Sequence, residues 1–345
     1  MNIDILTEDR LAALKDAIGQ AEKIVVCCHK SPDGDALGAV LTWVEYLKMV
    51  GKEPVAVIPD AFPDFLKWLP GNEQLLRYDK HPEEATQTIA AADLVFCLDF
   101  DGLDRLDLMA KAMEGFKGRY VVIDHHTNPR IPGALELSYP SMCSTCELIF
   151  RIICQLGGFD EMTRRMATTL YTGMMTDTGG FTYNSTRPEI YHIIGLLLTK
   201  GIDKDKIYRN VFNVYSSWAL RLRGYLMSQK LNVFDDFHAS YFTISRQDMK
   251  NFHFIKGDVE GLVNEPLRIK GMKLSISLRE DDRRDRVVWV SLRSVDDFPC
   301  NQMAAEFFNG GGHLNASGGR LDCSLEEAEK VVRAAIIHYE NLLKG

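Results

Sequence analysis

Acidic residues and histidines follow several short apolar stretches of the sequence, in a pattern that could bind divalent cations. Carboxylates gathered in one cleft repel one another and raise each other's pKa values unless cations neutralise them. Mixed carboxylate and imidazole ligands suit Mn²⁺, Mg²⁺ or Fe²⁺. The pattern therefore favours a divalent metal site, for which the candidate residues are His29, Asp33, Asp35, Asp99, Asp124, His125, His126 and Asp177.

Each of these patterns has a purely structural alternative when it is taken singly. The spacing of His29, Asp33 and Asp35 also fits a turn at a strand end with an aspartate helix cap, and the DHH triplet also fits a solvated loop. Asp177, which precedes Thr and Gly, is typical of a turn. The metal site is favoured because the acids and histidines recur at the ends of successive predicted strands.

The elements that must position these side chains alternate between strand and helix in the first half of the chain. Short apolar strands that alternate with helices predict a doubly wound parallel sheet covered on both faces. In such a sheet, ligands bind at the carboxyl ends of the strands. The predicted strands are 23–29, 54–58, 93–99 and 119–124, and helical patterns lie at 35–51 and 81–92.

The second half of the chain changes pattern twice. From 144 to about 230 the apolar residues recur with helical periodicity, and strand signals return at 239–245, 272–280 and 285–294 before a closing helix. We therefore expect a catalytic domain at 1–215, a helical linker at 216–235, and a smaller α/β domain with a mixed sheet at 236–345.

Composition and charge narrow the classes of partner. The net charge of −8 argues against extended duplex DNA, because sequence-independent DNA binding needs clustered Lys and Arg. A short RNA or a small nucleotide needs only a local positive site. The sequence has no apolar run long enough for a membrane span, and its start, MNIDILTEDR, lacks the features of a secretory signal. We expect a cytoplasmic protein that does not bind membranes.

Cys143 and Cys146 form a CxxC motif, which in other contexts binds zinc or carries redox chemistry. A structural zinc site needs a second ligand pair at suitable spacing, and the sequence offers none. We interpret both cysteines as small residues near a helix start, with Ser144 or Thr145 as its cap.

The motifs carry a resemblance to a known family. HKSPDGDALG, FCLDFDG, VVIDHHTN and MMTDTGGF resemble the four motifs of the DHH phosphoesterases, and FNGGGHLNASGG resembles the GGGH motif of their C-terminal DHHA1 domain. Within the family, the chain is most similar to the stand-alone two-domain nanoRNases. These metal-dependent enzymes degrade very short RNA and remove the 3′-phosphate of pAp by two-metal activation of water.

The resemblance implies a role for each residue of the first domain. It implies that two Mn²⁺ ions are bound, with Mg²⁺ or another divalent cation as an alternative. His29, Asp33 and Asp99 would hold one ion, and Asp99 would bridge to a second ion held by Asp35, His125 and Asp177. Asp124 would orient an imidazole, for which a structural hydrogen bond to the nearby loop is the alternative. His126 would donate a hydrogen bond to the scissile phosphate.

The resemblance also implies that the second domain holds the nucleotide end of the substrate. Gly310, Gly311 and Gly312 would let the backbone approach the ligand, and His313 would add a donor or a stacking surface. The alternative is a tight glycine turn with a capping histidine. Arg293 is a candidate phosphate ligand, although an ion pair with Asp296 or Asp297 is a rival interpretation. Of Phe307 and Phe308, we expect core packing more than base stacking.

Three functions stay open at this point. The first is a nanoRNase and pAp phosphatase, and the second is a phosphodiesterase for c-di-AMP or its linear product. The third is a nucleotide-binding regulator without catalysis, although such a protein would be expected to lack one or more ligands. A RecJ-like exonuclease or a family II pyrophosphatase is less favoured, since each should have a different C-terminal part. The sequence does not decide the oligomeric state, and a homodimer stays open.

Overall fold

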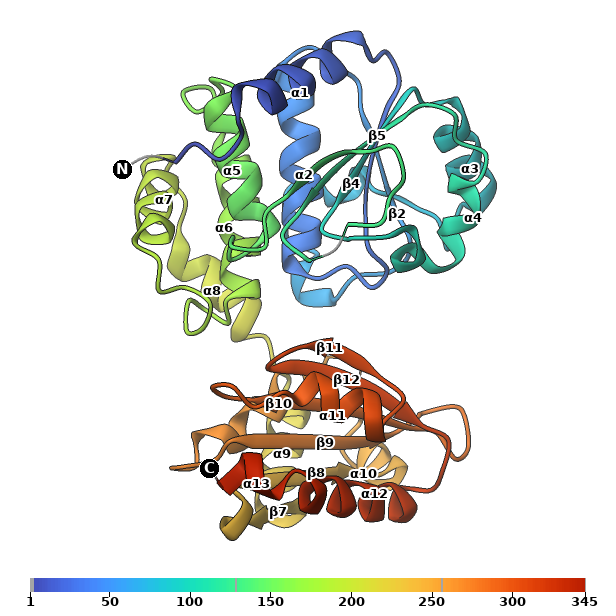
Figure 1. Ribbon diagram of the computed structural model, residues 1–345, viewed down its shortest axis with the longest axis vertical. Helices are drawn as coiled ribbons and strands as arrows, with labels where there is room; N and C mark the ends of the chain where they lie inside the picture. The colour runs from blue at the N-terminus through green and yellow to red at the C-terminus, as the bar shows by residue number, and fades with distance from the viewer. Residues whose placement is uncertain (1–2, 128, 256, 345) are drawn as a thin grey trace. The chain divides into compact units, whose positions relative to one another are not determined.

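The computed structural model describes residues 3–127, 129–255 and 257–344, and the chain folds into two compact units (Figure 1). The first unit comprises Met1–Val214 and the second Tyr215–Gly345. Each unit is built around its own six-stranded sheet. Because the placement of one unit relative to the other is not determined, each is described by itself.

The sheet of the first unit has the order β3-β2-β1-β4-β5-β6, and all its neighbouring strands are parallel. This confirms the predicted parallel sheet and places the ends of β1, β4 and β5 side by side. The short edge strands β3 and β6 were not predicted, since strands of two and four mostly half-exposed residues give little periodic signal. The strands are β1 (Ile24–Cys28), β2 (Val55–Ile58), β3 (Leu76–Arg77), β4 (Leu94–Leu98), β5 (Arg119–Asp124) and β6 (Leu135–Ser138).

Helices cover both faces of this sheet. Val26 and Cys28 of β1 point into a core shared with α2, α5 and α6, whereas Val25 and Cys27 point into a core shared with α3 and α4. Figure 1 shows these two sets of helices on opposite sides of the strands. The helices of the unit are α1 (Glu8–Gln20), α2 (Gly34–Met49), α3 (Pro82–Ala91), α4 (Ala110–Met113), α5 (Thr145–Gln155), α6 (Arg164–Asp177), α7 (Pro188–Thr199) and α8 (Lys204–Phe212), with short 3₁₀ segments η1 (Asp64–Leu66), η2 (Asn72–Gln74) and η3 (Leu103–Met109).

The starts of the helices that carry the site follow from side-chain caps. The Asp33 carboxylate accepts hydrogen bonds from the backbone N–H groups of Asp35 and Ala36, and so begins α2. Ser144 accepts from the backbone N–H of Glu147 and begins α5, which confirms one of the two expected caps. Cys143 and Cys146 are buried free thiols beside that helix start, as expected.

The second unit contains a mixed sheet in the order β11-β12-β10-β9-β8-β7, in which only the β8–β9 pair is parallel. The predicted mixed sheet is therefore confirmed. One face packs on α11 and α12, and the other on α9 and η6. The elements are α9 (Ser217–Tyr225), η4 (Leu226–Lys230, a π-helical turn), β7 (Leu231–Phe234), η5 (Asp235–Phe237), β8 (Ala239–Ile244), α10 (Arg246–Asn251), η6 (Leu262–Arg268), β9 (Leu274–Glu280), β10 (Val288–Ser294), α11 (Cys300–Phe307), β11 (Gly311–His313), β12 (Ala316–Leu321), α12 (Leu325–His338) and α13 (Glu340–Lys344).

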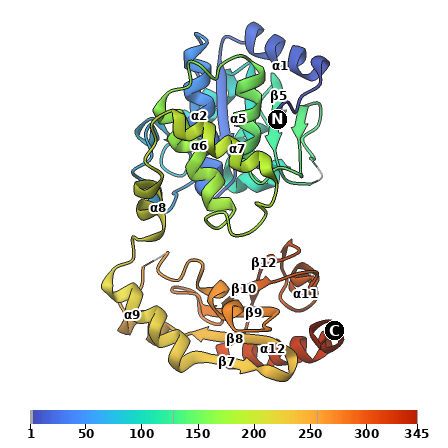
Figure 2. The ribbon, with the colours of Figure 1, turned by 90° about the vertical axis from the view of Figure 1, so that its left-hand side faces the viewer.

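The segment 216–235, predicted from the sequence as a helical linker, packs as part of the second unit. Leu222 of α9 and Leu226 are fully buried against Phe242 and other residues of that core. Helix α9 ends at Tyr225, the π-helical turn η4 follows, and the chain then enters β7, which pairs antiparallel with β8 (Figure 2). The sequence KLNVF has the alternation of an edge strand, which the apolar periodicity of the preceding helix obscures.

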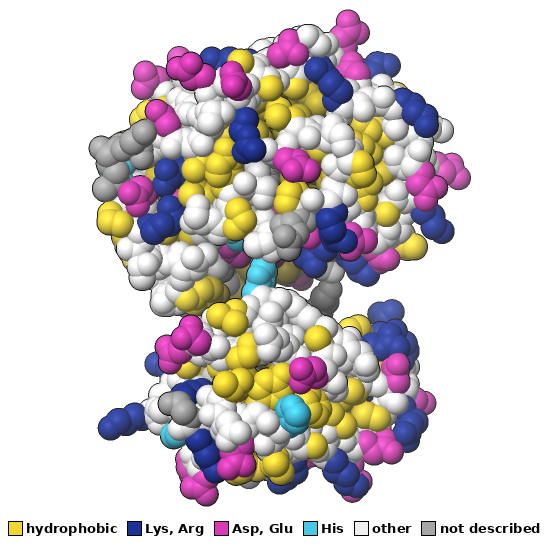
Figure 3. Space-filling model, in the orientation of Figure 1, with side chains coloured by type: hydrophobic (Ala, Val, Ile, Leu, Met, Phe, Trp, Pro, Cys, Tyr) yellow, Lys and Arg dark blue, Asp and Glu magenta, His cyan; other side chains and the backbone are white. Residues whose placement is uncertain are grey.

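Charged side chains of both signs intermingle on the faces of the two units that Figure 3 shows. Such a mixture forms no broad positive surface on these faces of the described residues. Among the described helices, none combines the length and apolar character that a bilayer crossing requires.

Candidate metal centre

The ends of three adjacent parallel strands and two helix ends meet at one edge of the first sheet. His29 follows β1, Asp99 follows β4, and Asp124 ends β5, so the sheet order β1-β4-β5 brings these residues together. Asp35 lies in the first turn of α2 and Asp177 is the last residue of α6. The candidate metal ligands of the sequence analysis are therefore all at this edge.

Close packing of α2 and α6 brings Asp177 to Asp35. A Cβ atom on Gly38 of α2 would lie 2.6 Å from the carbonyl oxygen of Thr169. On Gly173 of α6, it would lie 2.2 Å from Sγ of Cys146 and 2.9 Å from the Asp35 carboxylate. Only glycine fits at such distances, so the helix contact depends on these two residues.

A first cluster contains His29, Asp33 and Asp99, whose donor atoms lie within 4.8 Å of one another. Nε2 of His29 lies 3.4 Å from Oδ2 of Asp99 and 4.0 Å from Oδ2 of Asp33. Nδ1 of His29 is 2.8 Å from the carbonyl oxygen of Lys30. A hydrogen bond donated by Nδ1 leaves Nε2 with a lone pair for a metal ion.

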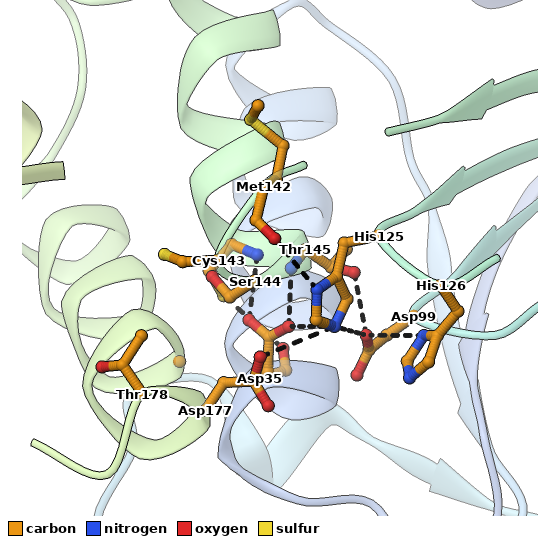
Figure 4. A network of polar contacts seen from close by, with 12 residues as sticks. Asp35, Asp99, His125, His126, Met142, Cys143, Ser144, Thr145, Asp177 and Thr178 are labelled. Atoms are coloured by element: carbon orange, nitrogen blue, oxygen red, sulfur yellow. Dashed lines mark hydrogen bonds and ion pairs between the residues drawn. The ribbon is translucent and has the colours of Figure 1, made fainter. Parts of the chain in front are cut away.

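A second cluster contains Asp35, His125 and Asp177, which also fall within 4.8 Å of one another (Figure 4). Nε2 of His125 lies 3.5 Å from Oδ2 of Asp177, 4.0 Å from Oδ2 of Asp35 and 3.6 Å from Oδ1 of Asp99. Asp99 thus contacts both clusters, with Oδ2 toward His29 and Oδ1 toward His125. This arrangement suits a carboxylate that bridges two cations.

The backbone of Asp99 has a left-handed conformation, with φ of 66°. Such values are uncommon outside glycine, asparagine and aspartate, and they recur at functional sites. The Asp99 side chain is 3% exposed. The sheet therefore ends in a sharp turn that directs this carboxylate inward between the two clusters.

Asp124 and His126 form a separate pair beside the clusters. Nδ1 of His126 is 2.7 Å from Oδ1 of Asp124, so the acid orients His126 and not the candidate ligand His125. Oδ2 of the fully buried Asp124 has no hydrogen-bond partner among the described residues. His126 also groups with Asp99 and His125 at metal-ligand spacing, which is an alternative to the phosphate-donor role that the resemblance implies.

The electrostatics of the carboxylates reveal an excess of buried negative charge. Burial, and next the charge of Asp99, raise the pKa of Asp35 to about 7. Burial and the charge of Asp35 raise the pKa of Asp177 well above its usual range. The pKa of Asp99 is lowered although burial opposes this, because His29, His125 and His126 surround it.

The histidines respond in the opposite sense. Burial lowers the pKa of His29, but the hydrogen bond and charge of Asp99 outweigh it and raise the pKa to about 9. For His125, the charges of Asp99, Asp177 and Asp35 likewise outweigh burial and give a pKa of about 9. The protein thus balances the carboxylates with protons in the absence of cations. Hard divalent cations, which prefer carboxylate oxygens and accept imidazole, fit this donor set.

Several residues that support the clusters were missed in the sequence. The hydroxyl of Thr145 donates to Oδ1 of Asp99, and the backbone N–H groups of Thr145 and Cys146 donate to Asp35. Glu147, fully buried, accepts hydrogen bonds from the Cys143 backbone, Arg151 and Arg187. From the sequence alone, the motif STCE predicts only a helix cap. The contact of its threonine with Asp99 joins residues 46 positions apart and leaves no local signal.

In the second unit, the predicted glycines divide into two kinds. A Cβ on Gly310 would lie 1.9 Å from the carbonyl oxygen of Gly318, and Gly312 has φ of 142°, so the β11–β12 hairpin itself requires both. A Cβ on Gly311 would meet nothing within 4 Å. Gly311 and His313 are exposed on β11. Internal packing therefore does not explain Gly311.

The other candidates of the second unit are also placed. Arg293 donates from Nη1 to the carbonyl oxygen of Leu292, 2.8 Å away, and no carboxylate of the described chain forms an ion pair with it. The ion pair with Asp296 or Asp297 is thus not formed in the described residues. Phe308 is fully buried, and Phe307 packs on His338 and Tyr339, so both contribute to the core.

The chain has relatives of known activity. It is 30% identical over 315 residues, 90% of its length, to the bifunctional oligoribonuclease and PAP phosphatase NrnA of Thermus thermophilus, of which it covers 88%. It is 26% identical over 345 residues to the cyclic-di-AMP phosphodiesterase GdpP of Geobacillus thermodenitrificans; that alignment takes in 95% of this chain but only 49% of GdpP.

The fold has a close counterpart among solved structures. An exopolyphosphatase-related protein from Bacteroides fragilis superposes with a TM-score of 0.95 at 46% identity, over 99% of each chain. Residues 23–174 match the DHH family, N-terminal domain, and this range contains every candidate ligand except Asp177. Motifs, site geometry and relatives agree, and the chain belongs to the DHH family of phosphoesterases.

Proposed function

We propose that this protein hydrolyses short oligoribonucleotides and the 3′-phosphate of pAp, with two Mn²⁺ ions as its cofactor. The observation that carries the proposal is the position of Asp99, whose two oxygens face two separate groups of histidine and carboxylate ligands. One ion would be held by His29, Asp33 and Asp99. The other would be held by Asp35, Asp99, His125 and Asp177.

A pair of divalent cations, when bound, activates water and stabilises charge on the phosphoryl oxygens. The residues of the chain supply the rest. His126 is held by Asp124, and although burial lowers the pKa of His126, the hydrogen bond to Asp124 outweighs it and raises the pKa. A protonated imidazole held in this orientation donates a hydrogen bond to an anionic phosphate oxygen. No side-chain nucleophile is required.

In the second unit, Arg293 and the exposed turn at Gly311 and His313 would bind the nucleotide. The guanidinium of Arg293 has no carboxylate partner among the described residues and suits a phosphate group. Gly311 leaves open space beside the backbone, where a ligand could approach closely. The available guanidinium and the open space at Gly311 are the basis for expecting a short substrate with a terminal phosphate.

A second candidate substrate is c-di-AMP or its linear product, and the similarity to GdpP favours it. The same ligands and the same chemistry would serve both substrates. The third candidate, a regulator without catalysis, is less favoured, because the predicted ligand positions are all occupied by histidine or aspartate and lie together at one sheet edge.

The experiment is a parallel assay of pApA, pAp and c-di-AMP with Mn²⁺, using the full chain and the Asp99→Ala variant. We expect turnover of pApA and pAp that falls by a factor on the order of 10³ or more in the variant, since loss of the shared ligand removes several kcal/mol of transition-state stabilisation. Preference for c-di-AMP would assign the second substrate. Nucleotide binding without turnover in Mn²⁺, Mg²⁺ or Fe²⁺ would revive the regulator and contradict the proposal.

A further inference from the structure

Thr145, the first residue of α5, contacts the carboxylates of both ligand clusters (Figure 4). Its hydroxyl donates to Oδ1 of Asp99 at 2.8 Å, and its backbone N–H donates to Oδ2 of Asp35 at 2.6 Å. The Cys146 backbone N–H donates to the other oxygen of Asp35 at 2.9 Å. Thr145 itself is fully buried, and it is not one of the candidate metal ligands.

The hydroxyl of Thr145 restrains the terminal torsion of Asp99 through a 2.8 Å hydrogen bond, which is shorter than the 3.4 Å contact of the same carboxylate with Nε2 of His29. The terminal torsion of an aspartate is broad and lacks the three staggered wells of a saturated side chain. Rotation of the Asp99 carboxylate would turn both oxygens toward one cluster, and so replace a bridge by chelation of a single ion. A hydrogen bond to Oδ1 holds that oxygen on the side of His125, while Oδ2 stays 3.4 Å from Nε2 of His29.

The position of Thr145 is in turn set by rigid surroundings. A β-branched residue has few χ1 rotamers in a helix. Ser144 caps α5, and the buried Glu147 accepts from the Cys143 backbone at 2.8 Å and from Arg187 at 2.5 Å. A shift of the helix start would therefore break the ion pairs that the buried Glu147 forms with Arg151 and Arg187, and these contacts keep the hydroxyl aimed at Asp99.

From these contacts we infer that Thr145 is a positioning residue that holds Asp99 in its bridging orientation, so that the two cations bind as a coupled pair. The inference rests on the metal centre of the proposed function. It concerns how the ions are held and is independent of which nucleotide is cleaved.

The test uses the full chain with Thr145→Val, which keeps the shape and removes the hydroxyl, and Thr145→Ser, which keeps the hydroxyl. Thr172→Val is the matched control, because Thr172 is also fully buried on a helix of this unit but its hydroxyl donates to the backbone carbonyl of Thr168. Calorimetric Mn²⁺ titration gives the two affinities. Electron paramagnetic resonance distinguishes a coupled Mn²⁺ pair from isolated ions without any substrate.

In Thr145→Val we expect the second ion to bind about 10- to 100-fold more weakly, the range typical for residues that orient metal ligands. The coupled spectrum should give way to that of isolated ions, and Thr145→Ser should restore it. Affinities and spectrum that match those of Thr172→Val would overturn the inference, as would equal weakening of both ions. If Thr145→Val does not fold, Thr145→Ala against Thr145→Ser makes the same comparison.

The failure of this inference is separable from failure of the proposed function. Wild-type protein that binds a coupled pair but cleaves none of the three nucleotides would overturn the function and leave the role of Thr145 intact. Active wild-type protein with an unchanged coupled pair in Thr145→Val would overturn the role of Thr145 alone.

Discussion

The two units carry their candidate residues in opposite physical states. In the first unit the candidates are largely buried, and every one of Asp35, Asp99 and His125 lies within 4 Å of another member of the group. In the second unit Gly311 and His313 are exposed on a hairpin. The first arrangement is costly in the absence of a cation, whereas the second is not.

This difference decides how much each region says about its function. Buried like charges raise pKa values and must be neutralised by protons or by cations, so the first site has a physical reason to bind a divalent cation. An exposed turn can exist for its own structural reasons. Its function has to be inferred from what the fold does not require, which here is the open space at Gly311.

The Asp177→Asn variant is the strongest test of the contrast between the buried site of the first unit and the exposed hairpin of the second. We expect kcat to fall by a factor on the order of 10³, because a ligand of the second cluster is lost. The metal-free protein should nevertheless gain stability, since burial and Asp35 raise the pKa of Asp177 and the neutral amide avoids that cost. Activity assays and thermal unfolding with and without Mn²⁺ measure both effects.

Glu161→Gln is the matched control, since Glu161 is an exposed carboxylate of the same unit. Glu161→Gln should change neither kcat nor the unfolding temperature of the metal-free protein. A metal-free Asp177→Asn protein that unfolds at a lower temperature than the wild type would show that the cluster is not strained by excess negative charge.

Most of the first site could be predicted because its information is local. Apolar strands that end in acids, combined with the rule that parallel strands share a carboxyl edge, predict that His29, Asp99 and His125 meet. The parallel sheet and the mixed sheet were both predicted. The edge strands β3, β6, β7 and β11 and the inner strand β12 were not, because short or glycine-rich segments give little periodic signal.

What the sequence did not reveal depends on contacts between distant residues. The hydrogen bond from Thr145 to Asp99 and the ion pair of Glu147 with Arg187 join elements far apart in the chain. Asp124 was expected to orient an imidazole, but which of its two histidine neighbours it contacts depends on side-chain rotation. Likewise, only the hairpin geometry separates Gly310, which the fold needs, from Gly311, which it does not.

The different roles of Gly310 and Gly311 give the second prediction. Gly310→Ala should destabilise the protein by about 1–3 kcal/mol, since its Cβ would clash with a backbone carbonyl. Gly311→Ala should leave the free energy of unfolding within about 0.5 kcal/mol of the wild type. Because a ligand is proposed to approach Gly311, this variant should raise KM for pApA about tenfold with little change in kcat.

Denaturant unfolding and steady-state kinetics of the two variants make the comparison. Unchanged KM in a fully folded Gly311→Ala protein would argue that the turn is structural only. The glycines would then carry no information on substrate binding, and Arg293 and His313 would be the remaining candidates in this unit.

The smallest expected effect is a pH dependence of stability in the first unit. The folded-state pKa values of His29 and His125 are raised to about 9, so their stabilising contribution is complete below their ordinary pKa of 6.5 and is lost as pH rises through about 9. Asp35, raised from 3.8 to about 7, acts in the same direction and loses its contribution as pH rises through 7. Asp99, with a lowered pKa, acts oppositely, but only in acid.

Metal-free protein should therefore have a Tm on the order of 5 °C lower at pH 9 than at pH 6.5. Saturating Mn²⁺ should flatten this dependence, because cations replace the protons and release them on binding. Calorimetry at pH 7.5 in two buffers of different ionisation enthalpy counts the released protons, which we expect to be about two or more, one from each imidazole and the rest from the carboxyls of Asp35 and Asp177, whose pKa values are raised. A Tm that stays constant or rises between pH 6.5 and 9 without metal would mean that protons do not balance the buried carboxylates, and the physical argument for a cation at this site would lose its basis.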